Sequence, residues 1–110
     1  GELDESIETL DVLIRHRPDF AEAWNKRATA YYLRGNFVRS LADCDKVFEL
    51  NPRHFGALAG AAIIHARMNR PEKALELFKR ALAVNPNMDD APETIRVLEQ
   101  QIAAKRGDMI

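Results

Sequence analysis

A 34-residue period constrains this sequence more than any other feature. Arg17-Pro18, Asn51-Pro52 and Asn85-Pro86 follow one another at intervals of 34 residues. Between the first two of these pairs lie two amphipathic segments of helical length, separated by Gly35. A fixed period of this length is typical of arrays in which one supersecondary unit is stacked several times. The sequence therefore predicts an all-α chain of stacked helical hairpins.

Six segments carry apolar residues at steps of three and four, the spacing of one helix face. The predicted helices cover residues 2–16, 20–33, 37–50, 55–67, 71–84 and 92–105. Gly35 suits the left-handed conformation that ends a helix, Asn36 suits an N-cap, and Pro71 suits a first helical turn. The chain from Ala103 to Ile110 is expected to fray. The expected core includes these larger side chains: Trp24, Tyr31, Phe48, Leu77, Phe78 and Leu82.

Composition narrows the classes of partner. A length of 110 residues suits one domain, and a formal net charge of −1 gives no general electrostatic case for nucleic acid or an anionic membrane. No apolar run approaches the ~20 residues of a membrane-spanning helix, so no membrane insertion is expected. The first residue is Gly and no leader follows it, which predicts a fragment or a processed chain. Its compartment stays open, with a soluble, cytoplasmic location favoured.

Residues with catalytic or metal-binding chemistry are scattered. The three histidines have no metal-ligand spacing, the lone Cys44 lies on an apolar helix face, and no glycine-rich phosphate loop occurs. The carboxylates are predicted to form solvated strips, because acid–base catalysis needs burial or coupling. We therefore predict no catalytic residue, no metal site, no cofactor and no enzymatic activity. The two strips are Asp43, Asp45 and Glu49 in one, and Asp89 and Asp90 in the other.

The side chains within each period carry a family resemblance. One unit supplies Trp24, Ala28, Tyr31, Gly35, Phe37, Cys44, Val47 and Pro52, and the next supplies Leu58, Ala61, Ala62, His65, Asn69, Pro71, Ala74, Phe78, Ala81 and Pro86. The opening helix matches half a unit through Gly1, Leu3, Ser6, Leu10, Leu13 and Pro18. This pattern resembles the tetratricopeptide repeat family. Arg27, Ser40, Asn69 and Pro71 depart from the usual residues, which are Leu, Ala, Gly and an aromatic residue.

The resemblance implies an α-solenoid of antiparallel helix hairpins, ending in a C-terminal capping helix. Residues 1–110 would form a single domain. Within it, 1–18 would be the second helix of a partial repeat, 21–54 and 55–88 full repeats, and 91–105 the capping helix.

The resemblance also implies a function, because the first helix of each hairpin lines a concave surface in such arrays. The chain would be a non-catalytic scaffold or adaptor that binds a protein segment, extended or helical, in that groove. Lys26 and Arg67 would be available for its carboxylates, although Ala59, Gly60 and Ile63 could instead pack against the next helix. The expected groove residues are Glu22, Asn25, Lys26, Thr29, Leu33, Gly56, Ala59, Gly60, Ile63 and Arg67.

One subclass of the family grips the Glu-Glu-Val-Asp tails of heat-shock chaperones with Lys, Arg and Asn residues on successive first helices. Gly56, Gly60 and Ile63 occupy much of that surface here, so we predict that this clamp is absent.

Two alternatives to an adaptor stay open. The apolar face of Ile7, Leu10 and Ile14 lacks the first helix of its own repeat, so it is expected either to be covered by preceding repeats or to form a homodimer edge. The chain could then be a structural oligomerisation module. It could also be the regulatory appendage of a larger protein.

Overall fold

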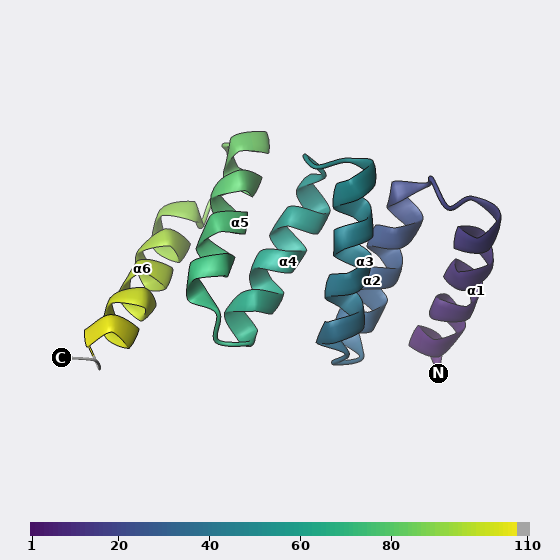
Figure 1. Ribbon diagram of the computed structural model, residues 1–110, viewed down its shortest axis with the longest axis horizontal. Helices are drawn as coiled ribbons and strands as arrows, with labels where there is room; N and C mark the ends of the chain where they lie inside the picture. Colours follow the sequence, from purple (N-terminus) through teal and green to yellow (C-terminus); the bar gives the residue numbers. More distant parts are fainter. Residues whose placement is uncertain (108–110) are drawn as a thin grey trace.

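The computed structural model describes residues 1–107 as a succession of α-helices along the long axis of the molecule (Figure 1). The elements are α1 (Glu2–His16), α2 (Ala21–Leu33), α3 (Phe37–Leu50), α4 (Phe55–Arg67), α5 (Pro71–Val84) and α6 (Ala91–Gly107). Each helix packs against the next in sequence, and the molecule measures 51 × 28 × 23 Å. Strands are absent from the described residues. The predicted all-α solenoid of helix pairs is confirmed.

The helix ends follow local sequence signals. Gly35, between α2 and α3, has a φ of 82°, and the Asn36 side chain accepts a hydrogen bond from the Arg39 N–H as the N-cap of α3. Asn69 takes the equivalent left-handed position before α5, with a φ of 59°. Asn tolerates this conformation better than other residues with a Cβ, which explains how it replaces the expected Gly.

The C-terminal helix is longer than the sequence indicates. We expected fraying from Ala103, but α6 continues to Gly107. Lys105 and Arg106 lie in its last turn, where positive charge stabilises the helix dipole, and Lys105 Nζ lies 3.4 Å from Glu72 Oε2 of α5. The fraying prediction is therefore wrong for residues 103–107, and its remainder, 108–110, lies outside the described residues.

The main core runs from α2 to the start of α6. Small residues lie where helices approach closely, and Ala57, Ala74 and Ala81 are completely buried. Three of the six predicted core side chains are buried: Tyr31, Leu77 and Phe78. The other three are half-buried: Trp24, Phe48 and Leu82.

Trp24 is half-buried because its ring lies at the edge of α2, beside the loop that connects α1 to α2. The indole Nε1 donates a hydrogen bond to the Pro18 carbonyl at 2.8 Å, which ties α2 to the chain that follows α1.

Helix α1 covers its own apolar face by packing on α2. Ile7 is 6 % exposed in a cluster with Ala30 and Tyr31, and Ile14 is 7 % exposed. The expected open edge of Ile7, Leu10 and Ile14 is therefore wrong for the two isoleucines. They lie seven residues apart, which places them on the same helix face toward α2. Leu10 is half-buried and lines the remaining hollow beside α2.

A charged cluster joins α1, α2 and α3. Arg27 donates to Asp43 from Nε at 2.9 Å and from Nη2 at 2.8 Å, and Nη1 donates to Asp11 at 2.8 Å. The guanidinium also lies over the Trp24 ring, 5.1 Å from its centroid. Asp43 is 4 % exposed, so its assignment to a solvated acidic strip is wrong. It is buried because Arg27 compensates its charge.

Candidate functional site

Three hollows lie along the helices that begin each pair. The N-terminal hollow lies between α1 and α2, the central hollow between α2, α3 and α4, and the C-terminal hollow between α4, α5 and α6. Ile63, 51 % exposed on α4, lines both the central and the C-terminal hollows. These two hollows are therefore neighbours on opposite sides of one exposed aliphatic side chain.

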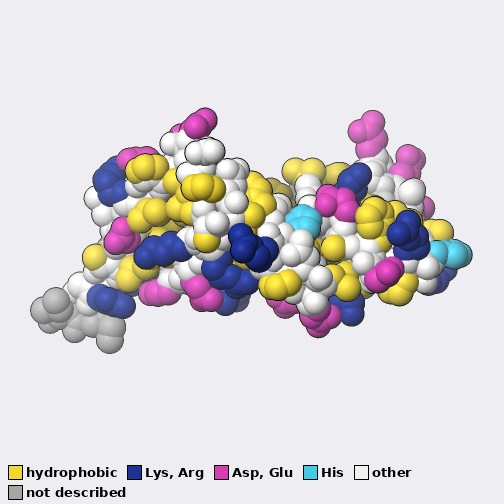
Figure 2. All heavy atoms as spheres, turned by 90° about the horizontal axis from the view of Figure 1, so that it is seen from above, with side chains coloured by type: hydrophobic (Ala, Val, Ile, Leu, Met, Phe, Trp, Pro, Cys, Tyr) yellow, Lys and Arg dark blue, Asp and Glu magenta, His cyan; other side chains and the backbone are white. Residues whose placement is uncertain are grey.

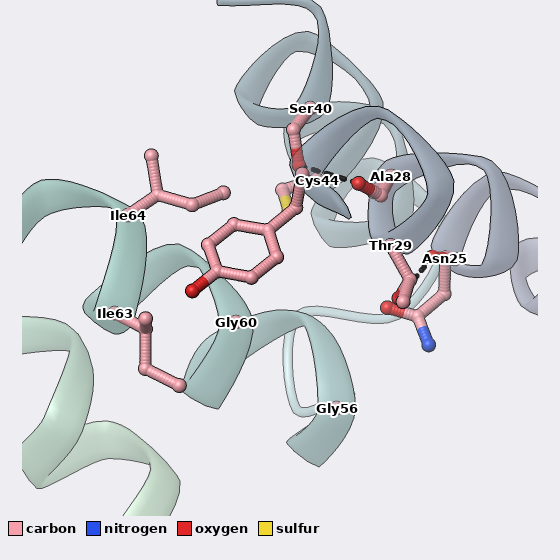
Figure 3. A pocket seen from close by; sticks show the side chains of 10 residues that line it. Asn25, Ala28, Thr29, Ser40, Cys44, Gly56, Gly60, Ile63 and Ile64 are labelled. Carbon is pink, nitrogen blue, oxygen red and sulfur yellow. Dashed lines mark hydrogen bonds between the residues drawn. The ribbon is translucent and has the colours of Figure 1, made fainter. Parts of the chain in front are cut away.

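The central hollow has a volume of about 150 Å³, close to that of one large side chain (Figure 3). Ile63 and Ile64 face Ala28, Ser40 and Cys44 across it. Gly56 and Gly60 present no side chain, so the backbone of α4 forms part of its wall (Figure 3). The Ser40 hydroxyl is buried and donates to the Ala28 carbonyl at 2.6 Å, which leaves the wall largely apolar. The remaining lining residues are Asn25, Thr29 and Tyr32.

Polar contacts between α2 and α4 lie at both ends of the central hollow. Near the helix N-termini, the His54 ring N–H donates to Glu22 Oε2 at 3.1 Å, while His54 Nδ1 accepts from the Ala57 N–H and caps α4. The hydrogen bond from His54 lowers the pKa of the Glu22 carboxyl. Near the C-termini, Arg67 Nη1 donates to the Tyr32 hydroxyl at 2.8 Å.

The C-terminal hollow is larger, with a volume of about 490 Å³. Its floor is apolar and includes Ala62, Phe78 and Leu98, each less than 10 % exposed. Among residues 1–107, its only charged lining residues are Asp89 and Asp90, in the segment before α6.

Eight of the ten expected groove residues line the three hollows, which adjoin at Thr29 and at Ile63. Lys26 and Leu33 line the N-terminal hollow, and Thr29 lines both that hollow and the central one. Arg67 is held by Tyr32 and by stacking over the Tyr32 and Phe37 rings, and Glu22 is held by His54, so both act first as structural contacts. Of the others, Asn25, Gly56 and Gly60 line the central hollow, and Ala59 lines the C-terminal hollow. Ile63 lines both.

Sequence reasoning missed several wall residues because they lie on second helices or on buried faces. Cys44 comes from α3, Phe78 from α5, and Ala28 and Ile64 from the buried faces of α2 and α4. Their helical periodicity identifies them as core residues, and only the packing shows that they also reach a hollow.

The structure gives these side chains little chemical reactivity. Burial, with a smaller contribution from Asp43 and Asp45, raises the pKa of the Cys44 thiol to about 12. Burial likewise lowers the pKa of His65, whose Nδ1 is enclosed without a hydrogen-bond partner among the described residues. Within residues 1–107, no group of three or more His, Cys, Asp or Glu side chains could hold a metal ion.

Charge is mixed over the end of the molecule that carries the α1–α2 and α3–α4 loops, where both signs occur along the length of the view (Figure 2). Within residues 1–107, no helix is long and apolar enough to span a bilayer.

Comparison with known proteins identifies the family. The family model described as "Tetratricopeptide repeat" matches residues 19–87. The chain belongs to the tetratricopeptide repeat family. It is 36 % identical over 101 residues to a TPR repeat-containing protein of Rhizobium etli, covering 92 % of this chain and 50 % of the relative. It is also 30 % identical over 106 residues to the Hsp70-Hsp90 organizing protein of Triticum aestivum, covering 96 % of this chain and 18 % of that protein. The chain thus spans half or less of these relatives.

Solved structures of tetratricopeptide repeat proteins share the fold. The first TPR of Spaghetti (RPAP3), bound to the HSP90 peptide SRMEEVD, superposes with a TM-score of 0.87 at 24 % identity, covering 94 % of this chain and 82 % of that one. The MamA protein gives a TM-score of 0.86 at 17 % identity, covering 94 % and 56 %. These likenesses show that the chain shares their fold.

Proposed function

We propose that this chain is a non-catalytic interaction module that binds a segment of another protein across the central and C-terminal hollows. The observation that carries this proposal is the position of Ile63 between two apolar hollows. A segment that crosses α4 would contact Ile63 and place one apolar side chain on each side of it. Burial of such side chains gives about 25 cal/mol per Å² of apolar surface before the costs of association.

The Arg27 cluster and the buried faces of α3 and α5 are already engaged within the chain. One superposed domain carries a bound peptide in its solved structure, which supports the binding of a protein segment by this fold. The identity of that peptide does not transfer to this chain, because the two proteins are only 24 % identical.

The proposal can be tested with a phage-displayed library of random dodecapeptides selected on the immobilised chain. We expect enriched clones that lose binding to Ile63→Glu, because a carboxylate between the hollows would be buried by the ligand. The matched control is Val12→Glu on α1, since Val12 is 49 % exposed and lines none of the three hollows. Selection of no clone that distinguishes Ile63→Glu from Val12→Glu would overturn the proposal.

A second variant separates ligand exclusion from charge. Gly60→Leu would place an apolar side chain in the space beside Gly60, where an added Cβ meets no heavy atom within 4 Å. We expect clones to lose binding to Gly60→Leu while circular dichroism shows an unchanged helix content. Retained binding would show that the central hollow is not occupied.

A further inference from the structure

The C-terminal hollow differs from the central one in its charge. Its floor is formed by buried apolar side chains of α4, α5 and α6, whereas both charged residues that line it, Asp89 and Asp90, are acidic and exposed. The central hollow has no charged lining residue. Of the two hollows that Ile63 separates, the C-terminal one therefore combines an apolar floor with two carboxylates, and the central one does not.

This negative charge is local, because the chain as a whole has 16 Lys and Arg residues against 17 Asp and Glu residues. Four of the eight basic residues of α3, α5 and α6 are paired with carboxylates elsewhere: Lys46 with Glu49, Lys73 with Glu76, Arg96 with Glu93, and Lys105 with Glu72. Within residues 1–107, no ion pair involves Asp89 or Asp90.

The two carboxylates differ in what the fold requires of them. Asp90 directly precedes Ala91, the first residue of α6, and its carbonyl accepts from the Thr94 N–H. A negative charge at this position stabilises the helix dipole, so Asp90 has a structural role. Asp89 lies one residue farther from the helix, where that effect is weaker, and it nevertheless lines the hollow.

We propose that the C-terminal hollow selects a partner segment in which an aliphatic or aromatic side chain lies next to Lys or Arg; this inference rests on the proposed function. The apolar side chain packs on Ala62, Phe78 and Leu98, and the cation approaches Asp89 and Asp90 at the rim. The methylene stem of the basic residue lies along the exposed Ala66 and Ile63. An acidic segment is excluded by repulsion from the same carboxylates.

The peptide selection described above tests this proposal when the enriched sequences are read and their affinities measured by fluorescence anisotropy. We expect Lys or Arg beside Leu, Ile, Met or an aromatic residue in the enriched clones. Asp89→Asn should weaken their binding about two- to fivefold, the usual range for one exposed ion pair, and Asp89→Lys should weaken it further. Salt should weaken the wild-type complex more than the Asp89→Asn complex.

Two controls separate the charge from its position and from folding. Glu99→Gln removes one exposed negative charge from α6 outside the three hollows, and it should change affinity less than twofold. Asp89→Glu keeps the charge and should retain binding. Equal circular dichroism spectra of Asp89→Asn and Asp89→Glu show that α6 is intact in both.

The outcomes distinguish this inference from the proposed function. Clones that depend on Ile63 but lack a basic residue, or that bind Asp89→Lys as tightly as the wild type, overturn the inference and leave the proposed function standing. If no clone depends on Ile63, both fail.

Discussion

Replacement of Asp43 by Ala should be one of the most destabilising single changes in this chain. The Asp43 side chain is 5 % exposed and accepts two hydrogen bonds from Arg27, at 2.9 and 2.8 Å. Removal of one partner of a buried ion pair costs about 3–5 kcal/mol, because the other charge is left uncompensated. Here the cost is reduced, since Arg27 is 18 % exposed and keeps its contact with Asp11 at 2.8 Å. We therefore expect a loss of about 2–3 kcal/mol.

The matched control is Asp11→Ala, which removes the other carboxylate from the same guanidinium. The Asp11 side chain is 40 % exposed, so this change should cost only about 0.2–1 kcal/mol. Arg27→Leu should be as damaging as Asp43→Ala, because it leaves the Asp43 carboxylate buried without a cation. The double replacement by Leu at 27 and 43 should recover most of the loss, since a well-packed apolar pair can replace a buried ion pair at little cost.

Urea unfolding followed by circular dichroism measures these differences. The single variant Asp43→Leu closes the double-mutant cycle with Arg27→Leu and the double variant, and the cycle gives the coupling energy. The expected coupling between positions 27 and 43 exceeds about 1 kcal/mol. The reasoning would be refuted if Asp43→Ala and Asp11→Ala lost similar free energy. The Arg27–Asp43 pair would then contribute no more to stability than an exposed ion pair, despite its burial.

Four further outcomes follow from the structure. Gly60→Ala should stabilise the chain by about 0.5–1 kcal/mol in urea unfolding, because nothing obstructs the added Cβ; Gly56→Ala should gain less, since its Cβ would meet the Asn25 Nδ2 atom at 3.2 Å. Cys44, with its pKa raised to about 12, should resist a thiol reagent at pH 8 until denaturant is added. Glu22, whose pKa lies below its ordinary 4.5, stabilises the fold above that value and loses this contribution as pH falls through its folded pKa. The Glu22→Gln difference, no more than about 0.5 kcal/mol for this exposed group, should therefore shrink between pH 6 and pH 3. A Glu-Glu-Val-Asp tetrapeptide should show no micromolar binding by calorimetry.

Each of these outcomes can also fail. A Gly60→Ala variant less stable than the wild type would place another group in the space beside α4. Rapid labelling of Cys44 in the native state would show that the central hollow opens to the reagent. A Glu22→Gln difference that grows toward pH 3 would reverse the assigned sign. Micromolar binding of the chaperone-tail peptide would show that residues outside the expected clamp recognise it.

The helices were predictable because their signals are local. Proline, glycine and asparagine at fixed offsets end and begin each helix, and the 34-residue period places the hairpins. The fraying expected from Ala103 did not follow from these signals, since no residue near Ala103 stops a helix and the next Gly is Gly107. The continuation of α6 to Gly107 follows from contact with α5, which the sequence does not display.

The candidate site was predictable only in part, because its walls depend on side-chain contacts between helices. The exposed Ile63 and the half-buried Gly60 follow from helical periodicity, whereas the burial of Asp43 depends on an arginine 16 residues away. The packing of Ile7 and Ile14 is a similar case. The sequence shows their apolar face, but only the structure shows that α2 covers it within the same chain.

The two hollows on either side of Ile63 differ in the polar contacts that join the helices of their walls. Glu22–His54 and Tyr32–Arg67 fix the spacing of these helices at both ends, whereas in the described chain no side-chain hydrogen bond or ion pair joins α4 to α6. The width of the C-terminal hollow therefore depends on the apolar packing of α6, whose Ala91 belongs to the main core and whose Ile95 packs against it. A ligand that widened the C-terminal hollow would have to move α6 out of that packing, whereas one that widened the central hollow would also have to break the two polar contacts.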